Sequence, residues 1–179
     1  MLAAQPMSCP MKTAPLLVLG SVLTLLGAAA GRSSAATTPQ RLGEIKSWTA
    51  ATYGSGADKA CYAFTNEDLP VGSKATPAML TVTERAKFRD EISLSQGITY
   101  TKGAKVVLTV GAQKFDFFTK DNMAYAMNGA NVIKALLGGF VVKATATAPN
   151  AQPVSNQFSL EGFRDAYKMI LKACPVTNR

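Results

Sequence analysis

Two cysteines, Cys61 and Cys174, are the residues with the clearest potential for chemistry in this chain of 179 residues. A third, Cys9, lies in an N-terminal segment that we interpret below as a removable leader. The even number that remains predicts a disulfide rather than metal ligands, because exported proteins reach a compartment in which thiols pair. Closing a loop of this length would stabilise the fold by roughly 4 to 5 kcal/mol.

The chain contains no histidine. The commonest general base, the usual partner of a nucleophilic Ser or Cys, and the usual zinc ligand are therefore missing. No serine is followed three residues later by lysine, so the Ser-Lys pattern of beta-lactamases is missing too, although a lysine from a distant strand could still serve. We predict that the protein is not an enzyme, with no catalytic, cofactor-binding or metal-binding residue and no cofactor.

Paired acids are the other route to catalysis. Asp116 and Asp121 flank the aromatic run at residues 115–118, and a glycosidase needs two carboxyl groups about 5 to 9.5 Å apart. We favour the interpretation that these acids only make the turns soluble. A small envelope enzyme or enzyme inhibitor that uses an acid pair or a Lys/Ser pair stays as an alternative.

One basic cluster, Arg85, Lys87 and Arg89, stands out in a chain whose net charge is +8. If the segment is extended, all three side chains share a face. That face could bind an anionic envelope glycolipid or polysaccharide, or a protein partner. Because Asp90 and Glu91 follow and partly cancel the charge, a solvated hairpin end is the simpler interpretation. We expect no nucleic-acid partner.

Residues 1–35 have the features of a signal peptide. An apolar run at residues 14–30 follows Lys12 and precedes small residues, the order that a signal peptidase recognises. The run is shorter than the roughly 20 apolar residues of a spanning helix, so the mature chain should have no transmembrane helix. We expect a periplasmic, cell-surface or secreted protein.

Two cleavage points fit, after Ala30 or after Ala35, and we prefer the second because Arg32 just beyond a scissile bond is unfavourable. Residues 1–10 are consistent with an over-extended gene start. Residues 36–179 then form a single domain, which is long enough to bury a core without a metal.

Most of this domain alternates with period two, which predicts strands. The expected strands are residues 44–53, 60–65, 78–85, 91–97, 105–111, 115–119, 140–147 and 157–159. A short helix is expected at residues 131–137 and an amphipathic helix from Phe163 to Cys174, with an exposed loop at residues 148–156. We predict a mainly β fold, an antiparallel β-sandwich or partly closed barrel with a short internal helix and a C-terminal helix.

An ordered set of short motifs spans roughly Trp48 to Cys174 and resembles the invasion-associated locus B family. The motifs are CYAF at 61–64, MLTVT at 79–83, EISLSQG at 91–97, FFTK at 117–120, SLEGF at 159–163, AY at 166–167 and AC at 173–174. The chain departs from the family pattern at Tyr125, where a tryptophan is expected.

The resemblance implies a small exported protein of alphaproteobacteria, a β-sandwich whose first and last cysteines are joined, with no catalytic residues to carry over. The family name comes from members linked to host-cell entry. We therefore expect an exported, non-enzymatic accessory protein of the envelope or periplasm that binds an envelope or host protein, with a role in host interaction or invasion.

Overall fold

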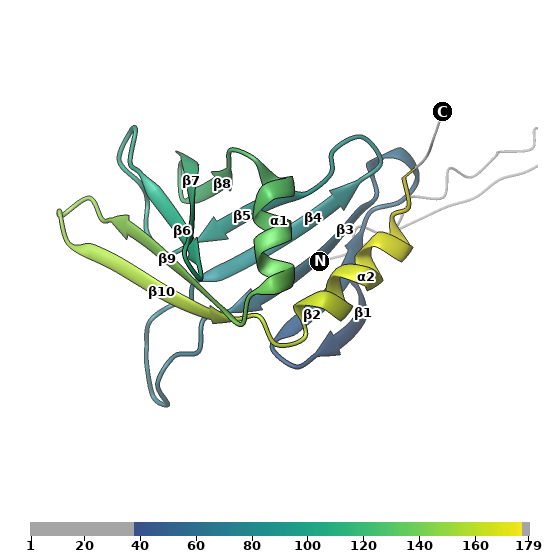
Figure 1. The fold of residues 1–179 in the computed structure, drawn as a ribbon, viewed down its shortest axis with the longest axis horizontal. Coiled ribbons are helices and arrows are strands. Elements are labelled where there is room, and N and C mark those ends of the chain that lie inside the picture. Colours follow the sequence, from purple (N-terminus) through teal and green to yellow (C-terminus); the bar gives the residue numbers. More distant parts are fainter. Residues whose placement is uncertain (1–37, 177–179) are drawn as a thin grey trace, which may run out of the picture. The chain divides into compact units, whose positions relative to one another are not determined.

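The computed structural model describes residues 38–176, and the predicted leader lies outside them. These residues form ten strands and two α-helices, which are labelled in Figure 1. The first five strands are β1 (Gln40–Ile45), β2 (Trp48–Tyr53), β3 (Ala60–Asn66), β4 (Met79–Arg85) and β5 (Glu91–Ser95). The others are β6 (Val106–Val110), β7 (Gln113–Lys120), β8 (Met123–Ala126), β9 (Val141–Thr147) and β10 (Pro153–Ser159). Helix α1 spans Gly129–Gly138 and helix α2 spans Phe163–Ala173.

All ten strands belong to one antiparallel sheet, in the order β1-β2-β3-β4-β5-β8-β7-β6-β9-β10. The sheet is not closed, because β1 and β10 form its two edges. The prediction of a mainly antiparallel β fold with an internal and a C-terminal helix is confirmed. The single sheet matches the partly closed barrel more nearly than a sandwich of two separate sheets.

The N-terminal hairpin was predicted wrongly as one strand at residues 44–53. The structure divides this region into β1 and β2, which pair with Ile45 opposite Trp48. Lys46 takes a left-handed backbone conformation, with φ 53°, and this lets the chain reverse within two residues. Ile45 and Trp48 are three residues apart, so the apolar alternation breaks at the turn, and the prediction of a single strand overlooked this break.

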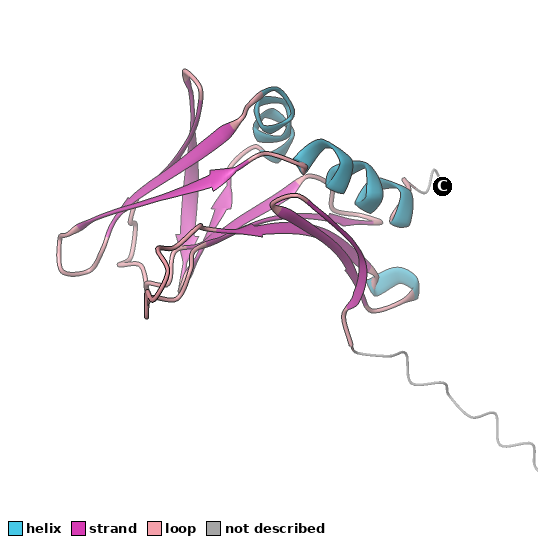
Figure 2. Ribbon diagram, turned by 90° about the horizontal axis from the view of Figure 1, so that it is seen from below, coloured by secondary structure: helices cyan, strands magenta, loops and turns pink. Residues whose placement is uncertain are grey.

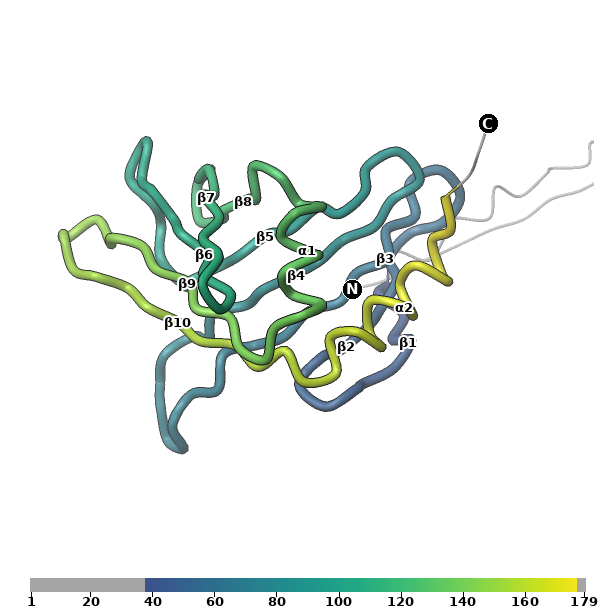
Figure 3. The backbone as a smooth tube through the Cα atoms, viewed as in Figure 1, coloured from purple at the N-terminus to yellow at the C-terminus, as the bar shows by residue number. Residues whose placement is uncertain are grey.

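Two further differences lie in the second half of the sheet. Strand β8 follows β7 after a tight turn in which Asp121 has φ 56°, and it was not predicted. Strand β10 begins at Pro153, inside the segment expected to be a loop, and pairs with β9 over its whole length. In Figure 3 this pair forms a long hairpin that projects from the rest of the sheet.

Both helices pack on the same side of the sheet (Figure 2). Helix α2 contacts β1, β2, β3 and β4, and it buries Phe163, Ala166 and Ile170 against them. Gly162 precedes the helix with φ +90°, and a Cβ there would collide with the carbonyl oxygen of Ile45. Only glycine fits this approach of the helix start to the β1–β2 turn.

The core lies on the helix-facing side of the sheet, where alternate strand residues point inward. Trp48, Leu80, Val82 and Leu94 are fully buried there. The indole Nε1–H of Trp48 donates to the carbonyl oxygen of Ser159, 3.0 Å away, and so joins β2 to the segment before α2.

The opposite face carries a row of cross-strand neighbours, which we call the aromatic–hydroxyl row. Five strands contribute one residue each, in the order Phe64, Thr81, Ser93, Tyr125 and Phe118. The rings of Phe118 and Tyr125 stack with their centroids 5.4 Å apart. Both helices lie on the other side of the sheet, so neither covers this row.

None of the helices within residues 38–176 is long and apolar enough to cross a membrane.

Candidate functional site

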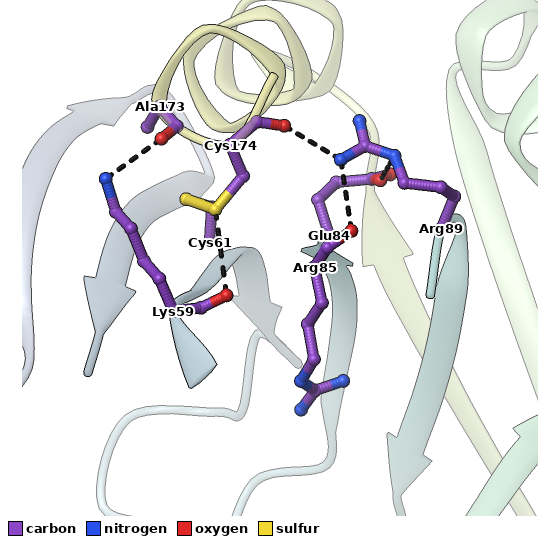
Figure 4. The surroundings of a disulfide bond; sticks show 7 residues. All are labelled: Lys59, Cys61, Glu84, Arg85, Arg89, Ala173 and Cys174. Atoms are coloured by element: carbon purple, nitrogen blue, oxygen red, sulfur yellow. Dashed lines mark hydrogen bonds and ion pairs between the residues drawn. A yellow bond between two sulfur atoms is a disulfide. The ribbon is translucent and has the colours of Figure 1, made fainter. Parts of the chain in front are cut away.

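The disulfide joins β3 to the end of α2 (Figure 4). Cys61 lies on the core face of β3 and is 0% exposed, and Cys174 is the residue that ends α2. Their Cα atoms are 5.9 Å apart, across a sequence separation of 113 residues. The predicted pairing of Cys61 with Cys174 is present in the structure.

Two cations flank the disulfide and bind the last carbonyl groups of α2 (Figure 4). Lys59 Nζ donates to the carbonyl oxygen of Ala173 at 2.9 Å, and Arg89 Nη1 donates to that of Cys174 at 2.8 Å. The last carbonyls of a helix have no partner within the helix and carry partial negative charge. Lys59 and Arg89 therefore cap α2 from both sides of the sulfur bridge.

Glu84 lies beneath this cap with its side chain fully buried. It is on the core face of β4, two residues after Val82, because alternate residues share a face. Arg89 Nε is 2.7 Å from Glu84 Oε2, and the backbone N–H of Asp90 donates to Oε1 at 3.3 Å. Within the described part of the chain, Oε2 accepts no well-aligned hydrogen bond.

Burial raises the pKa of Glu84 to about 7, because desolvation of the carboxylate outweighs the attraction of Arg89. The nearby charge of Asp90 contributes to this rise. The folded protein therefore binds a proton at Glu84 in a pH range where an unfolded chain would release it.

Asp90 extends the same group of charges to α2. The hydroxyl of Tyr167 donates to Asp90 Oδ1 at 2.7 Å, and burial together with this bond raises the pKa of Tyr167 well above its ordinary value. Gly129, the first residue of α1, packs so closely on Asp90 that a Cβ would collide with its carbonyl oxygen. We call Glu84, Arg89, Asp90 and Tyr167 the hairpin–helix cluster, since it joins the β4–β5 hairpin to α2.

The predicted basic cluster does not form one open face. Residues 86–90 bend instead of extending, Arg85 pairs with Glu91 at 2.5 Å, and Arg89 points inward to Glu84 and α2. Lys87 is exposed. Because two of the three charges are already paired, the hypothesis that Arg85, Lys87 and Arg89 together bind an anion loses its main support.

A family model described as "Invasion associated locus B (IalB) protein" matches residues 48–171. The chain belongs to this family. The match covers both the disulfide-bearing strand and nearly all of α2, so the hairpin–helix cluster lies within the part of the chain that defines the IalB domain.

A solved structure is similar in fold to this IalB chain. It is the crystal structure of invasion associated protein B from Bartonella henselae, which is 15% identical, with a TM-score of 0.54 over 71% of this chain and 93% of that one. A search of curated proteins found no match. The similarity in structure supports the fold, and the family description names no enzymatic activity.

The acids weighed as a catalytic pair have ordinary positions in this IalB domain. Asp116 is an exposed residue of β7, opposite Val107 of β6, and Asp121 lies in the turn before β8. No group of three or more His, Cys, Asp or Glu residues between 38 and 176 is placed to hold a metal ion.

A second, partly buried group of polar side chains joins the edge strand β10 to the residues that follow β3 and β5. Gln96 Nε2 donates to Asn156 Oδ1 at 2.6 Å, and Asn156 Nδ2 donates to Glu67 Oε2 at 2.8 Å. The hydroxyl of Tyr100 donates to Gln96 Oε1 at 2.9 Å, and burial raises its pKa to about 12. We call Glu67, Gln96, Tyr100 and Asn156 the edge-strand cluster.

Sequence reasoning missed the roles of Glu84 and Lys59. The signal for Glu84 was present, since it falls on the inward face of a strand that alternates cleanly. A charged residue at such a position needs a buried partner. Nothing local indicated that Lys59 would reach the end of a helix 114 residues later.

Proposed function

We propose that this chain is an exported, non-enzymatic accessory protein of the cell envelope that binds another protein. The aromatic–hydroxyl row is the observation that carries the proposal. It sets stacked rings beside hydroxyl groups on a face that neither helix covers, and Phe118 is 50% exposed. Aromatic residues are enriched in protein interfaces, where they supply most of the binding energy.

The buried polar groups support a binding role rather than catalysis. Glu84 has a pKa suited to proton transfer, but it is fully buried and faces Arg89. A general acid or base must reach the substrate within hydrogen-bonding distance. Both polar clusters instead join elements of the fold to each other.

Export is supported by the disulfide and by the predicted leader. A buried disulfide forms and persists in an oxidising compartment and is rare in the cytosol. We therefore propose that the protein acts in the periplasm, at the cell surface or after secretion.

The names of the relatives indicate the partner classes. The family and the Bartonella henselae protein are both named for an association with invasion. A host protein is accordingly one partner class in the proposal, and a protein of the same cell's envelope is the other.

The test is site-specific photocrosslinking in intact cells. A photoreactive phenylalanine analogue replaces Phe118 in one variant and Phe140 in a control, because Phe140 is 89% exposed but lies beside α1 and α2 rather than in the row. We expect a protein crosslinked at position 118 and none at position 140. Equal products at both positions, or none at 118, would contradict the proposal.

Affinity measurements then separate the proposal from its alternative. Phe118→Ala should weaken partner binding by about 2 kcal/mol, roughly 30-fold, with unchanged thermal stability. If the protein instead binds an anionic glycolipid or polysaccharide, binding should fall steeply with added salt and be insensitive to Phe118→Ala.

A further inference from the structure

The two edges of the sheet are protected to different degrees. Strand β10 begins with Pro153, which has no N–H to offer, and Asn156 binds the residues that directly follow β3 and β5 through the edge-strand cluster. Strand β1 pairs only with β2, and its outer edge meets no other strand of the described chain. An edge of this kind presents backbone groups that can pair with a further strand.

The side chains of β1 are complementary to a second copy of the same strand. A bulge at Leu42 shifts the register between Arg41 and Gly43, so Arg41 and Glu44 both point to the outer face and form an exposed ion pair. In an antiparallel pair of β1 strands centred between Leu42 and Gly43, Arg41 falls directly opposite the partner's Glu44. Opposite charges at directly paired positions favour that register, and like charges would oppose it.

An apolar hollow accompanies the same edge on the helix side. Leu42 and Met169 are 40% and 38% exposed, and with Lys172 and Ala173 they line a hollow of about 350 Å³. A two-fold axis that passes between the two β1 strands, beside the centre of β1, would place one copy of the hollow on each side of the new strand pair. The apolar side chains would then contact each other across the axis.

We propose that β1 is a self-association edge: two copies of the chain pair antiparallel through β1, with Arg41 of each opposite the partner's Glu44. The dimer continues the sheet from one copy into the other and covers both Leu42–Met169 hollows. It leaves the aromatic–hydroxyl row of each copy open, so it does not depend on the proposed function.

Sedimentation equilibrium tests this proposal. The sample is the whole protein in the form in which the cell processes it. The wild-type protein should dimerise. Arg41→Glu should raise the dimer dissociation constant about tenfold, since two ion pairs become repulsive contacts. The double variant Arg41→Glu/Glu44→Arg should restore dimerisation, because it exchanges the two charges.

Lys168→Glu is the matched control, because it changes the net charge equally at an exposed position of α2 and should leave the dissociation constant unchanged. A wild-type chain that stays monomeric at all concentrations would overturn the proposal. So would a double variant that dimerises no better than Arg41→Glu. Crosslinking at Phe118 should be the same in wild type and Arg41→Glu, which separates failure of the dimer from failure of the proposed function.

Discussion

Two polar clusters lie at opposite ends of β4 and β5 and hold the sheet by different means. The hairpin–helix cluster is charged: a buried carboxylate, Glu84, faces Arg89 beneath the end of α2. In the edge-strand cluster, by contrast, the side-chain amide of Gln96 forms hydrogen bonds with the side-chain amide of Asn156 and with the hydroxyl of Tyr100.

The difference follows from what each cluster must bind. The end of a helix presents several unpaired carbonyls with partial negative charge, so cations such as Lys59 and Arg89 suit it. Bringing Arg89 inward then requires a counter-charge, which Glu84 supplies. The edge of a sheet carries no such net dipole, so β10 needs no buried cation: Asn156 binds the uncharged Gln96 and the carboxylate of Glu67, which is only partly buried.

The largest expected effect comes from removing the disulfide. Cys61→Ala/Cys174→Ala should lower the free energy of unfolding by about 5 kcal/mol, because the unfolded chain regains the freedom of a long loop. Hydrogen exchange should accelerate first in α2 and later in β10. Unchanged denaturant midpoints would contradict the expected loss of stability. Simultaneous acceleration of exchange in both elements would contradict the expectation that the disulfide mainly holds α2 in place.

Next in size is Arg89→Ala, which leaves the carboxyl of Glu84 buried without its cation. We expect a loss of about 3 kcal/mol at pH 8, measured by urea unfolding, and a smaller loss at pH 5, where Glu84 is protonated. Arg85→Ala is the control, because the Arg85–Glu91 pair is partly exposed and should contribute less than about 1 kcal/mol. Equal losses of stability for the two variants would contradict the expectation that the buried Arg89–Glu84 pair matters more than the Arg85–Glu91 pair.

The smallest effect should come from the edge-strand cluster. Gln96→Leu removes the side-chain amide that links Tyr100 to Asn156 and should cost about 1 to 2 kcal/mol. The loss should be the same at pH 5 and pH 8, since a side-chain amide does not titrate and Tyr100 has a pKa of about 12. A loss that varies with pH would erase the contrast between the clusters.

Period-two alternation predicted most of the sheet, because an inward and an outward face alternate along each strand. It failed where a break in the alternation was overlooked, as between Ile45 and Trp48, and where a strand was too short to show a period, as at β8. The C-terminal helix was predictable, since Phe163, Ala166 and Ile170 recur at helical spacing and are the residues it buries.

The site was only partly predictable. The pairing of Cys61 with Cys174 followed from cysteine number and export. The partners of Glu84 and Lys59 did not, because they depend on how α2 crosses the sheet. Arg85, Lys87 and Arg89 looked alike in sequence, but the bend at residues 86–90 directs Arg89 inward and leaves Lys87 exposed.

The most direct test of the account is the pH dependence of unfolding in wild type and Glu84→Gln. The pKa of Glu84 is raised from 4.5 in the unfolded chain to about 7 in the folded protein, so the folded state binds more protons between these values. Wild-type stability should therefore fall as pH rises from 5 to 8, by on the order of 2 kcal/mol, and Glu84→Gln should lose most of this slope. Identical slopes in the two proteins, or a wild type that gains stability with pH, would contradict the account.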